Sequence, residues 1–295
     1  MIEMASARTL WAMHPDALAA LLTRGTIDAM LPESLRALAG IAGLASNAPK
    51  EARAQADPVR DGATMVISLS GPLSPKGSYG GTSTERFADQ VRSAGADSKV
   101  GAVILNIMSP GGWVFGTHEA GEAVYEVRQS KPVIAVASPF SFSAAHWIAC
   151  QASAYYVTHS GEVGSVGVRG GHVDMSGFED KIGMKTTLIA SSPEKIAGHP
   201  YAPLSDEDRA EMQASIDESN EAFRAAIARG RGIKASEVEA MHGSGRTFSA
   251  ARAAAAGTVD GVMSLRDVIA KYGSSRARLG LMRQRAEMRA RALDF

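Results

Sequence analysis

Apolar runs alternate with amphipathic stretches over residues 64–158. The runs MVISLSG, VGAVILNI, PVIAVAS and AYYVT carry β-branched residues and stop at glycine, proline or polar positions, which is typical of buried strands. Between them, STERFADQVRSAG, HEAGEAVYEVRQ and SAAHWIACQA have the spacing of helices, and Ser83 or Thr84 is suited to cap the first. This order predicts an α/β domain of βαβ units with right-handed crossovers.

The pattern after Lys185 predicts one more strand and several helices. TTLIA resembles a strand, and Ser205 is suited to cap a long helix whose first turn is acidic. A shorter helix is expected in ASEVEAMHG, and residues 246–273 combine short apolar pieces with an alanine-rich helix.

The two ends of the chain differ from the middle. Leu10, Met13 and Ala17 have helical spacing, and residues 45–60 are polar and rich in alanine and proline, as in a linker. The last stretch holds six arginines against two acidic residues and suggests a basic helix, either solvated or docking a partner protein or nucleic acid. We therefore expect an N-terminal helical segment with linker at 1–60, an α/β domain at 61–272 and an Arg-rich helix or tail at 273–295.

Composition narrows the class of protein. With 295 residues, 45% of them hydrophobic, the chain is long enough for a large core. The 31 basic and 31 acidic residues cancel, so no overall charge draws the body to nucleic acid or anionic lipid. Cys150 is the only cysteine and cannot form an internal disulfide, which favours a cytoplasmic setting. Residues 1–20 lack the pattern of a secretory signal, and no apolar run has the length of a membrane span.

The segment NIMSPGG is the first candidate for chemistry. It ends a predicted strand, and Gly111 and Gly112 allow a sharp turn with backbone N–H groups unobstructed by a Cβ. Such a turn suits an oxyanion hole, although a Pro-Gly-Gly sequence taken alone is more often a plain turn.

Ser143 and Lys195 are the next candidates. Ser143 stands where a predicted strand meets a helix, so it is suited either to cap that helix or to act as a nucleophile, with the Ala144 N–H facing the oxyanion. Lys195 is one of nine lysines against 22 arginines and follows a predicted strand. A lone lysine is usually a surface charge, but a neutral lysine amine can accept a proton from serine.

Four ordered motifs carry a resemblance to a known family. The strand ending in NIMSPGG, the segment SFSAAHWIA, the GEVGSVGV run at 161–168 and KIAGHPYAPLSDED from Lys195 resemble the signal peptide peptidase A family of Ser/Lys dyad peptidases over about residues 60–272. Within that family, the phage head-maturation (prohead) proteases, which include minor capsid protein C, are most similar. The resemblance implies a Clp/crotonase-like spiral of βαβ units.

The resemblance also assigns roles to residues. It implies Ser143 as nucleophile, Lys195 as general base and Ser165 as the residue that orients the lysine. Gly111 or Gly112 and Ala144 then supply backbone N–H groups to the oxyanion. The chain departs from bacterial signal peptide peptidases at Ala144 and Ala145, where they usually have glycines.

The family resemblance further implies a biological setting. It suggests a serine endopeptidase that processes scaffold, portal or capsid proteins during phage head assembly, in the host cytoplasm, the procapsid or the virion. It also implies a homo-oligomer, because relatives often assemble into rings or domes with sites built between subunits. No cofactor is expected.

Several alternatives remain open. A Ser/His/Asp triad is disfavoured because His159 and His172 do not stand where the fold would require a histidine, and His146 shares a helix with Ser143. No cluster has metal-ligand spacing, so we expect no metal, and Cys150 is expected in the core. A crotonase-like acyl-CoA enzyme, a non-catalytic capsid- or scaffold-binding protein and a signal-peptide-degrading peptidase are the competing functions.

Overall fold

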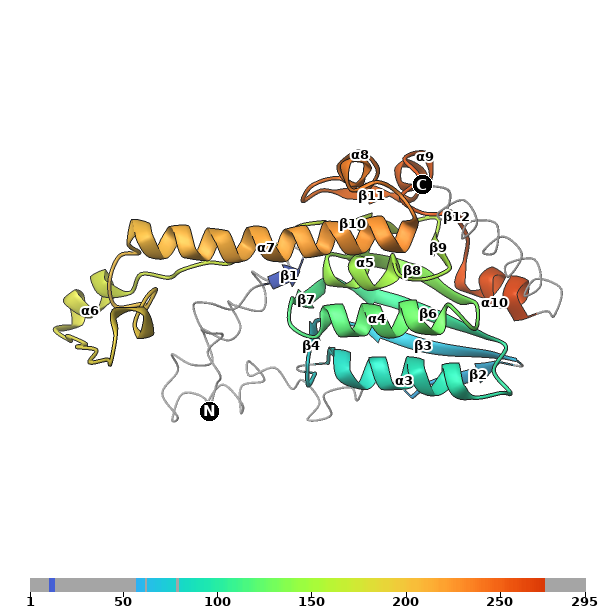
Figure 1. Cartoon of the computed structure of the whole chain (residues 1–295), viewed down its shortest axis with the longest axis horizontal. Helices are drawn as coiled ribbons and strands as arrows, with labels where there is room; N and C mark the ends of the chain where they lie inside the picture. Colours follow the sequence, from blue (N-terminus) through green and yellow to red (C-terminus); the bar gives the residue numbers. More distant parts are fainter. Residues whose placement is uncertain (1–10, 14–56, 62, 78–79, 274–295) are drawn as a thin grey trace, which may run out of the picture.

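The computed structural model describes residues 11–13, 57–61, 63–77 and 80–273 (Figure 1). The prediction of a helix near the N-terminus is wrong for Trp11–Met13, because these residues form the strand β1. The remainder of that helix, most of the linker and the Arg-rich tail lie outside the described residues.

A mostly parallel sheet forms the centre of the molecule. Its strands run in the order β11-β10-β8-β6-β3-β2, with β9 paired to both β8 and β12. Neighbours β3, β6 and β8 are parallel, whereas β2 and β11 are antiparallel at the two edges. The four apolar runs form the expected strands β3 (Thr64–Ser70), β6 (Ala102–Ser109), β8 (Val133–Phe142) and β9 (Ala154–Val157). The sheet also contains the short strands β2 (Val59–Asp61), β10 (Glu162–Gly164), β11 (Thr247–Ser249) and β12 (Gly261–Val262). Within the GEVGSVGV motif, strand β10 ends at Gly164.

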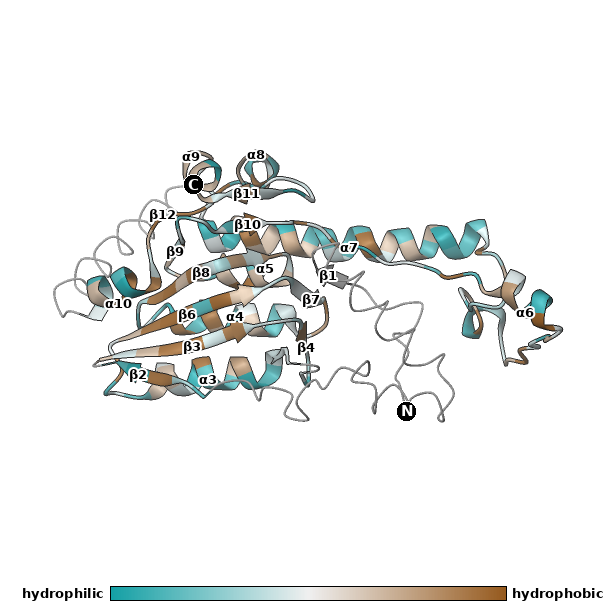
Figure 2. Cartoon of the chain, turned by 180° about the vertical axis from the view of Figure 1, so that it is seen from behind, coloured by the Kyte–Doolittle hydropathy of each residue, from teal (hydrophilic) through white to brown (hydrophobic). Residues whose placement is uncertain are grey.

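Helices cover both faces of this sheet. One core cluster joins alternate β6 residues such as Leu105 to α3 (Thr84–Ala96), α4 (Thr117–Val127) and α5 (Ala144–Ala149). A second cluster joins Ile104 and its neighbours to α10 (Leu265–Gly273). The hydropathy colouring in Figure 2 shows apolar strands between helices with polar outer faces. The α/β fold class predicted from the alternating pattern is confirmed.

Strand β8 changes its neighbour along its length. Residues Ile134 to Ala137 pair with β9, whereas Phe140 to Phe142 pair with β10. The sheet therefore divides where β8 ends, and Ser143 follows directly at this division.

A small second sheet lies beside the main one, in the order β1-β7-β4-β5. It contains β4 (Leu73–Ser74), β5 (Thr82–Ser83) and β7 (Gly111–Trp113). A Cβ on Gly112 would lie 2.0 Å from the Leu73 carbonyl oxygen, so only glycine fits where β4 and β7 meet. The strand β1 pairs with the other edge of β7.

Residues 166–205, here called the arm, leave the body and return through the long helix α7 (Asp206–Arg231). The arm contains α6 (Ser176–Ile182) and the 3₁₀ turn η1 (Pro193–Lys195), and Figure 1 shows α6 beyond the far end of α7. The prediction of a strand at 186–190 is wrong, because none of the described strands pairs with this apolar stretch.

Helix α7 joins the arm to the body. Ser205 caps it as expected, its hydroxyl accepting the Asp208 N–H at 3.0 Å. The first buried residue of α7 is Phe223, whose ring stacks on Trp147 of α5 at 4.7 Å. The first half of α7 therefore projects from the body, and the second half packs on it.

The last described segments follow α7 on the body. They are η2 (Ala235–Glu237), α8 (Val238–His242) and α9 (Ala250–Ala255). None of the described helices is long and apolar enough to cross a membrane.

Candidate active site

Ser143 lies in a strained turn between β8 and α5. Its backbone has φ 53° and ψ −119°, a conformation that a non-glycine residue adopts at a cost of order 1–3 kcal/mol. Its N–H donates to the Gly164 carbonyl at 2.8 Å, which fixes the turn against β10. The side chain makes no capping hydrogen bond to α5. The local geometry is that of a sharp strand-to-helix turn that holds a serine Oγ at the head of a helix, and differs from an ordinary N-cap.

Ser165 stands beside Ser143 on the neighbouring segment. Because Gly164 is in register with Phe142, the next residue of each segment is adjacent. Ser165 also has a positive φ, 56°, and its N–H donates to the Arg246 carbonyl at 2.8 Å. Within the described part of the chain, Ser143 and Ser165 are the non-glycine residues with positive φ. Backbone strain therefore coincides with two residues that the sequence singled out.

The glycine turn after β6 is tied down by Ser109. The Ser109 hydroxyl donates to the Gly71 carbonyl at 2.7 Å and accepts the Gly111 N–H at 3.2 Å. This use of the Gly111 N–H leaves Gly112 as the better oxyanion donor of the two. Sequence reasoning assigned no role to Ser109, although its place within SPGG could have suggested one.

The Ala144 N–H is the second candidate donor. Ala144 is the first residue of α5, so its N–H has no acceptor within the helix. Helix α5 packs against β7, which carries Gly112. The fold thus brings Ser143, Ala144 and the glycine strand into one region of the body.

Lys195 lies outside this region. It is exposed at the end of η1 in the arm, and no hydrogen bond within the described ranges joins it to Ser143. The Ser143 Oγ instead lies 3.5 Å from the Gly167 carbonyl oxygen, and the serine is 1% exposed. One chain therefore does not bring the two members of the expected dyad together.

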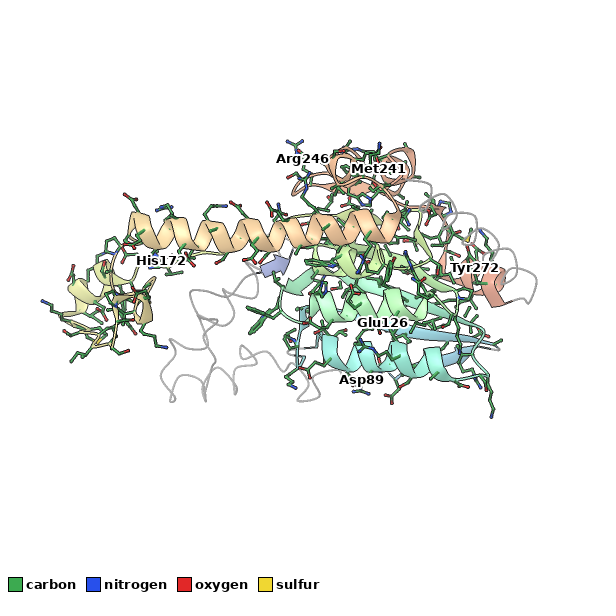
Figure 3. The ribbon with its side chains drawn as sticks, in the orientation of Figure 1. Asp89, Glu126, His172, Met241, Arg246 and Tyr272 are labelled. Atoms are coloured by element: carbon green, nitrogen blue, oxygen red, sulfur yellow. The ribbon has the colours of Figure 1, made fainter. Side chains whose placement is uncertain are left out.

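The arm holds its own shape through local hydrogen bonds. The Met175 N–H donates to the Pro200 carbonyl at 2.6 Å, and the His172 ring lies within hydrogen-bond distance of the His199 carbonyl, at 3.0 Å. Figure 3 shows His172 at the arm's end of α7, far from Arg246 on the body. The outgoing and returning segments are thus joined to each other at a distance from Ser143.

A buried cluster of His146, Cys150 and His242 joins α5 to α8. Its ligand atoms all lie within 4.8 Å of one another. His146 Nε2 lies 3.0 Å from His242 Nδ1 and 3.5 Å from the Cys150 sulfur, while its Nδ1 meets the Tyr155 hydroxyl at 3.1 Å. The search of the sequence for metal-ligand spacing missed this cluster, because His242 is 96 residues from His146 in the chain. Cys150 lies in the core as expected.

Burial and nearby charges shift the pKa values of all three members of this cluster. Burial, with the nearby His242 and Arg231 charges, lowers the pKa of His146 well below its usual value. Burial and the Arg231 charge lower the pKa of His242 to about 4. Burial raises the pKa of the Cys150 thiol to about 12. The contacts of His146 with His242, Cys150 and Tyr155 form a buried hydrogen-bond network within the body.

Comparison with known proteins assigns the family. Residues 126–277 match peptidase family S49, a span that includes Ser143, Ser165 and Lys195. The chain belongs to peptidase family S49. This confirms the resemblance inferred from the four motifs.

Individual relatives of the S49 chain include phage proteins. It is 32% identical over 208 residues to the head-tail preconnector protein GP5 of Enterobacteria phage P21, covering 69% of this chain and 41% of that protein. It is 29% identical over 251 residues to the capsid assembly protease C of Escherichia phage lambda, covering 82% and 56%. The chain spans about half the length of these relatives.

A solved structure, that of the 1510-N membrane-bound stomatin-specific protease in complex with a substrate peptide, is 16% identical and covers 72% of this chain and 81% of that one, with a TM-score of 0.45.

Proposed function

We propose that this S49 chain is a serine endopeptidase that cleaves peptide bonds through an acyl-enzyme on Ser143. The observation that carries the proposal is the strained turn at Ser143, which is tied to β10 and leaves the side chain uncommitted to capping. Strain of this kind persists where the surrounding structure over-determines it, and it concentrates at reactive residues. Membership of a peptidase family favours this function over acyl-CoA chemistry or a purely structural role.

The chemistry follows from the groups around Ser143. The Oγ attacks the substrate carbonyl carbon, and the N–H groups of Gly112 and Ala144 stabilise the oxyanion that forms. A base takes the serine proton and returns it to the leaving amine, and water then hydrolyses the ester. Loss of one oxyanion donor costs roughly 100-fold or more in rate in related acyl-transfer enzymes.

We assign the base to Lys195 of a second copy of the chain. Lys195 belongs to the arm, which projects beyond the body in Figure 1, whereas Ser143 lies on a body that offers it no lysine partner among the described residues. A head-to-tail contact between copies would place the arm of one chain over the turn of the next. Such a contact repeats around a closed ring, which agrees with the homo-oligomer that the resemblance implies.

Exposed apolar side chains support this contact. Ile189 is 94% exposed and Val173 69% exposed, and both belong to the arm. On the body, Met108 and Phe115 are exposed at 45% and 58% on either side of the glycine strand β7. Exposed apolar side chains on both the arm and the body would be buried by such a contact. We infer that the arm of one copy covers this apolar rim of another.

The substrates we propose are scaffold, portal or capsid proteins of a phage head. The names of two relatives, a capsid assembly protease and a head-tail preconnector protein, support this class of substrate. The host cytoplasm, where heads assemble, is the corresponding place of action.

The proposed function is tested by co-expressing the chain with the neighbouring capsid genes. Ser143→Ala and Lys195→Ala should each lower cleavage at least about 10³-fold, because members of such a catalytic unit act together. Mass spectrometry of the products measures the loss, and circular dichroism checks that both variants fold. Lys185→Ala, in the same arm, is the matched control and should retain cleavage. Unchanged processing by folded Ser143→Ala protein would contradict the proposal.

A further inference from the structure

The edge of β7 is occupied by a segment from the start of the chain. Strand β1 pairs antiparallel with β7, with Trp11 opposite Trp113, Ala12 opposite Gly112 and Met13 opposite Gly111. The opposite edge of β7 is paired with β4, so β1 takes the edge that the body leaves open. Figures 1 and 2 both show β1 beside β7, near α5.

This edge is where an extended substrate would bind. Strand β7 begins at the glycine turn held by Ser109, and it packs against α5, the helix that Ser143 precedes. A peptide added to an open strand edge is held by its main chain, which tolerates many side chains. An extended peptide on β7 would therefore run past the Gly112 and Ala144 donors, in the position that β1 holds.

The register identifies the bond within reach of the donors. The Gly111 N–H is already donated to the Ser109 hydroxyl, so Gly112 is the remaining glycine donor. Gly112 stands opposite Ala12. The Ala12 carbonyl is thus the one that the register aligns with the candidate oxyanion hole.

We propose that the chain's own N-terminal segment is a substrate, bound as strand β1 and cleaved between Ala12 and Met13. This inference rests on the proposed function. Ser143 Oγ bonds to the Ala12 carbonyl carbon, the carbon–nitrogen bond to Met13 breaks, and the serine proton passes through the lysine base to the Met13 nitrogen. Solvent water then hydrolyses the ester, giving a carboxylate on Ala12 and restoring the Ser143 hydroxyl.

Cleavage has a consequence for other substrates. A tethered strand has a high effective concentration and competes with free peptides for the same edge. After the cut, residues 1–12 are no longer joined to the chain and can leave β7. The uncut protein should therefore hydrolyse other peptides slowly, and the cut protein should hydrolyse them faster.

The test follows the intact mass of purified full-length protein with time, together with hydrolysis of fluorescently labelled casein. Wild type should acquire a new amino terminus at Met13, and casein hydrolysis should show a lag that ends as the cut completes. The Ser143→Ala protein should stay intact. Ala12→Pro removes an N–H from β1 and weakens strand pairing, so it should prevent the cut and abolish the lag. Ala5→Pro, outside β1, is the matched control and should behave as wild type.

The possible results separate the two proposals. A cut at any other bond, with Ala12 and Met13 still joined, overturns the proposed register of β1 on β7. Casein hydrolysis without a lag, by protein whose N-terminus stays intact, overturns the self-cleavage and leaves the peptidase in place. Absence of all hydrolysis by folded wild type, assembled as it is in solution, overturns both.

Discussion

The body and the arm divide the proposed catalytic groups between two kinds of structure. The body surrounds Ser143 with buried strands and helices, and its turn is fixed by backbone hydrogen bonds to β10. The arm carries Lys195 at its surface, has few buried side chains and is held by local hydrogen bonds. The proposed nucleophile therefore gains its geometry from one chain's core, whereas the proposed base depends on what the arm contacts. Substitutions in the body should change folding, and substitutions in the arm should change assembly and activity.

The largest contrast should come from removing one aromatic side chain from each region. Trp147 is 2% exposed and stacks on Phe223, so Trp147→Ala should lower the free energy of unfolding by about 3–5 kcal/mol. Phe178 in the arm is 48% exposed, so Phe178→Ala should change the free energy of unfolding by less than about 0.5 kcal/mol. Urea unfolding measures both. Equal losses would mean that the arm is as much a part of the folded core as α5.

A smaller effect should come from the pH dependence of the body's free energy of unfolding. His242 has a pKa lowered to about 4 by burial, below the value of about 6.5 that it takes when unfolded. The unfolded state therefore binds more protons between these values, and stability falls as pH drops from about 6.5 to about 4, by roughly 3 kcal/mol at most.

A His242→Asn variant isolates this contribution. Urea midpoints measured from pH 7 to pH 5 should fall less steeply in the variant than in wild type. His159→Gln, an exposed position, is the control and should keep the wild-type slope. A slope in the His242 variant as steep as in wild type would place the acid sensitivity elsewhere.

The smallest effect on folding should accompany a change in assembly. Ile189 is 94% exposed in the arm, so Ile189→Asp should alter the free energy of unfolding by less than about 0.5 kcal/mol. A charge at the proposed contact should nevertheless weaken association and lower casein hydrolysis about tenfold or more. Sedimentation velocity and the hydrolysis rate measure these two effects. Wild-type assembly and activity in the variant would remove Ile189 from the contact.

Sequence patterns predicted the body much better than the arm. The runs that form β3, β6 and β8 are apolar on both sides because helices cover both faces of the sheet, and this signal is local. The stretch TTLIA also combines β-branched and apolar residues, but it pairs with no strand in the described part of the chain and so is not a strand. The helical spacing around Trp11–Met13 is likewise overridden by pairing with β7, a contact about 100 residues away in the chain.

Sequence motifs named candidate site residues but could not predict their geometry. The motifs singled out Ser143 and Ser165, but no pattern told a strained turn from a helix cap. The Ser109 bonds to the glycine turn and the contact of His242 with His146 depend on tertiary packing. The separation of Lys195 from Ser143 depends on the course of the arm, which no short motif encodes.

The most direct test of the shared site is to mix two inactive proteins. Ser143→Ala protein supplies an intact arm with Lys195, and Lys195→Ala protein supplies an intact Ser143 turn. If copies exchange at random in an equal mixture, about one quarter of the contacts between copies join an intact serine to an intact lysine. We predict that casein hydrolysis, absent from each protein alone, returns in the mixture to about a quarter of the wild-type rate. A mixture that exchanges copies but stays inactive would contradict the account, because the serine and its base would then have to come from one chain.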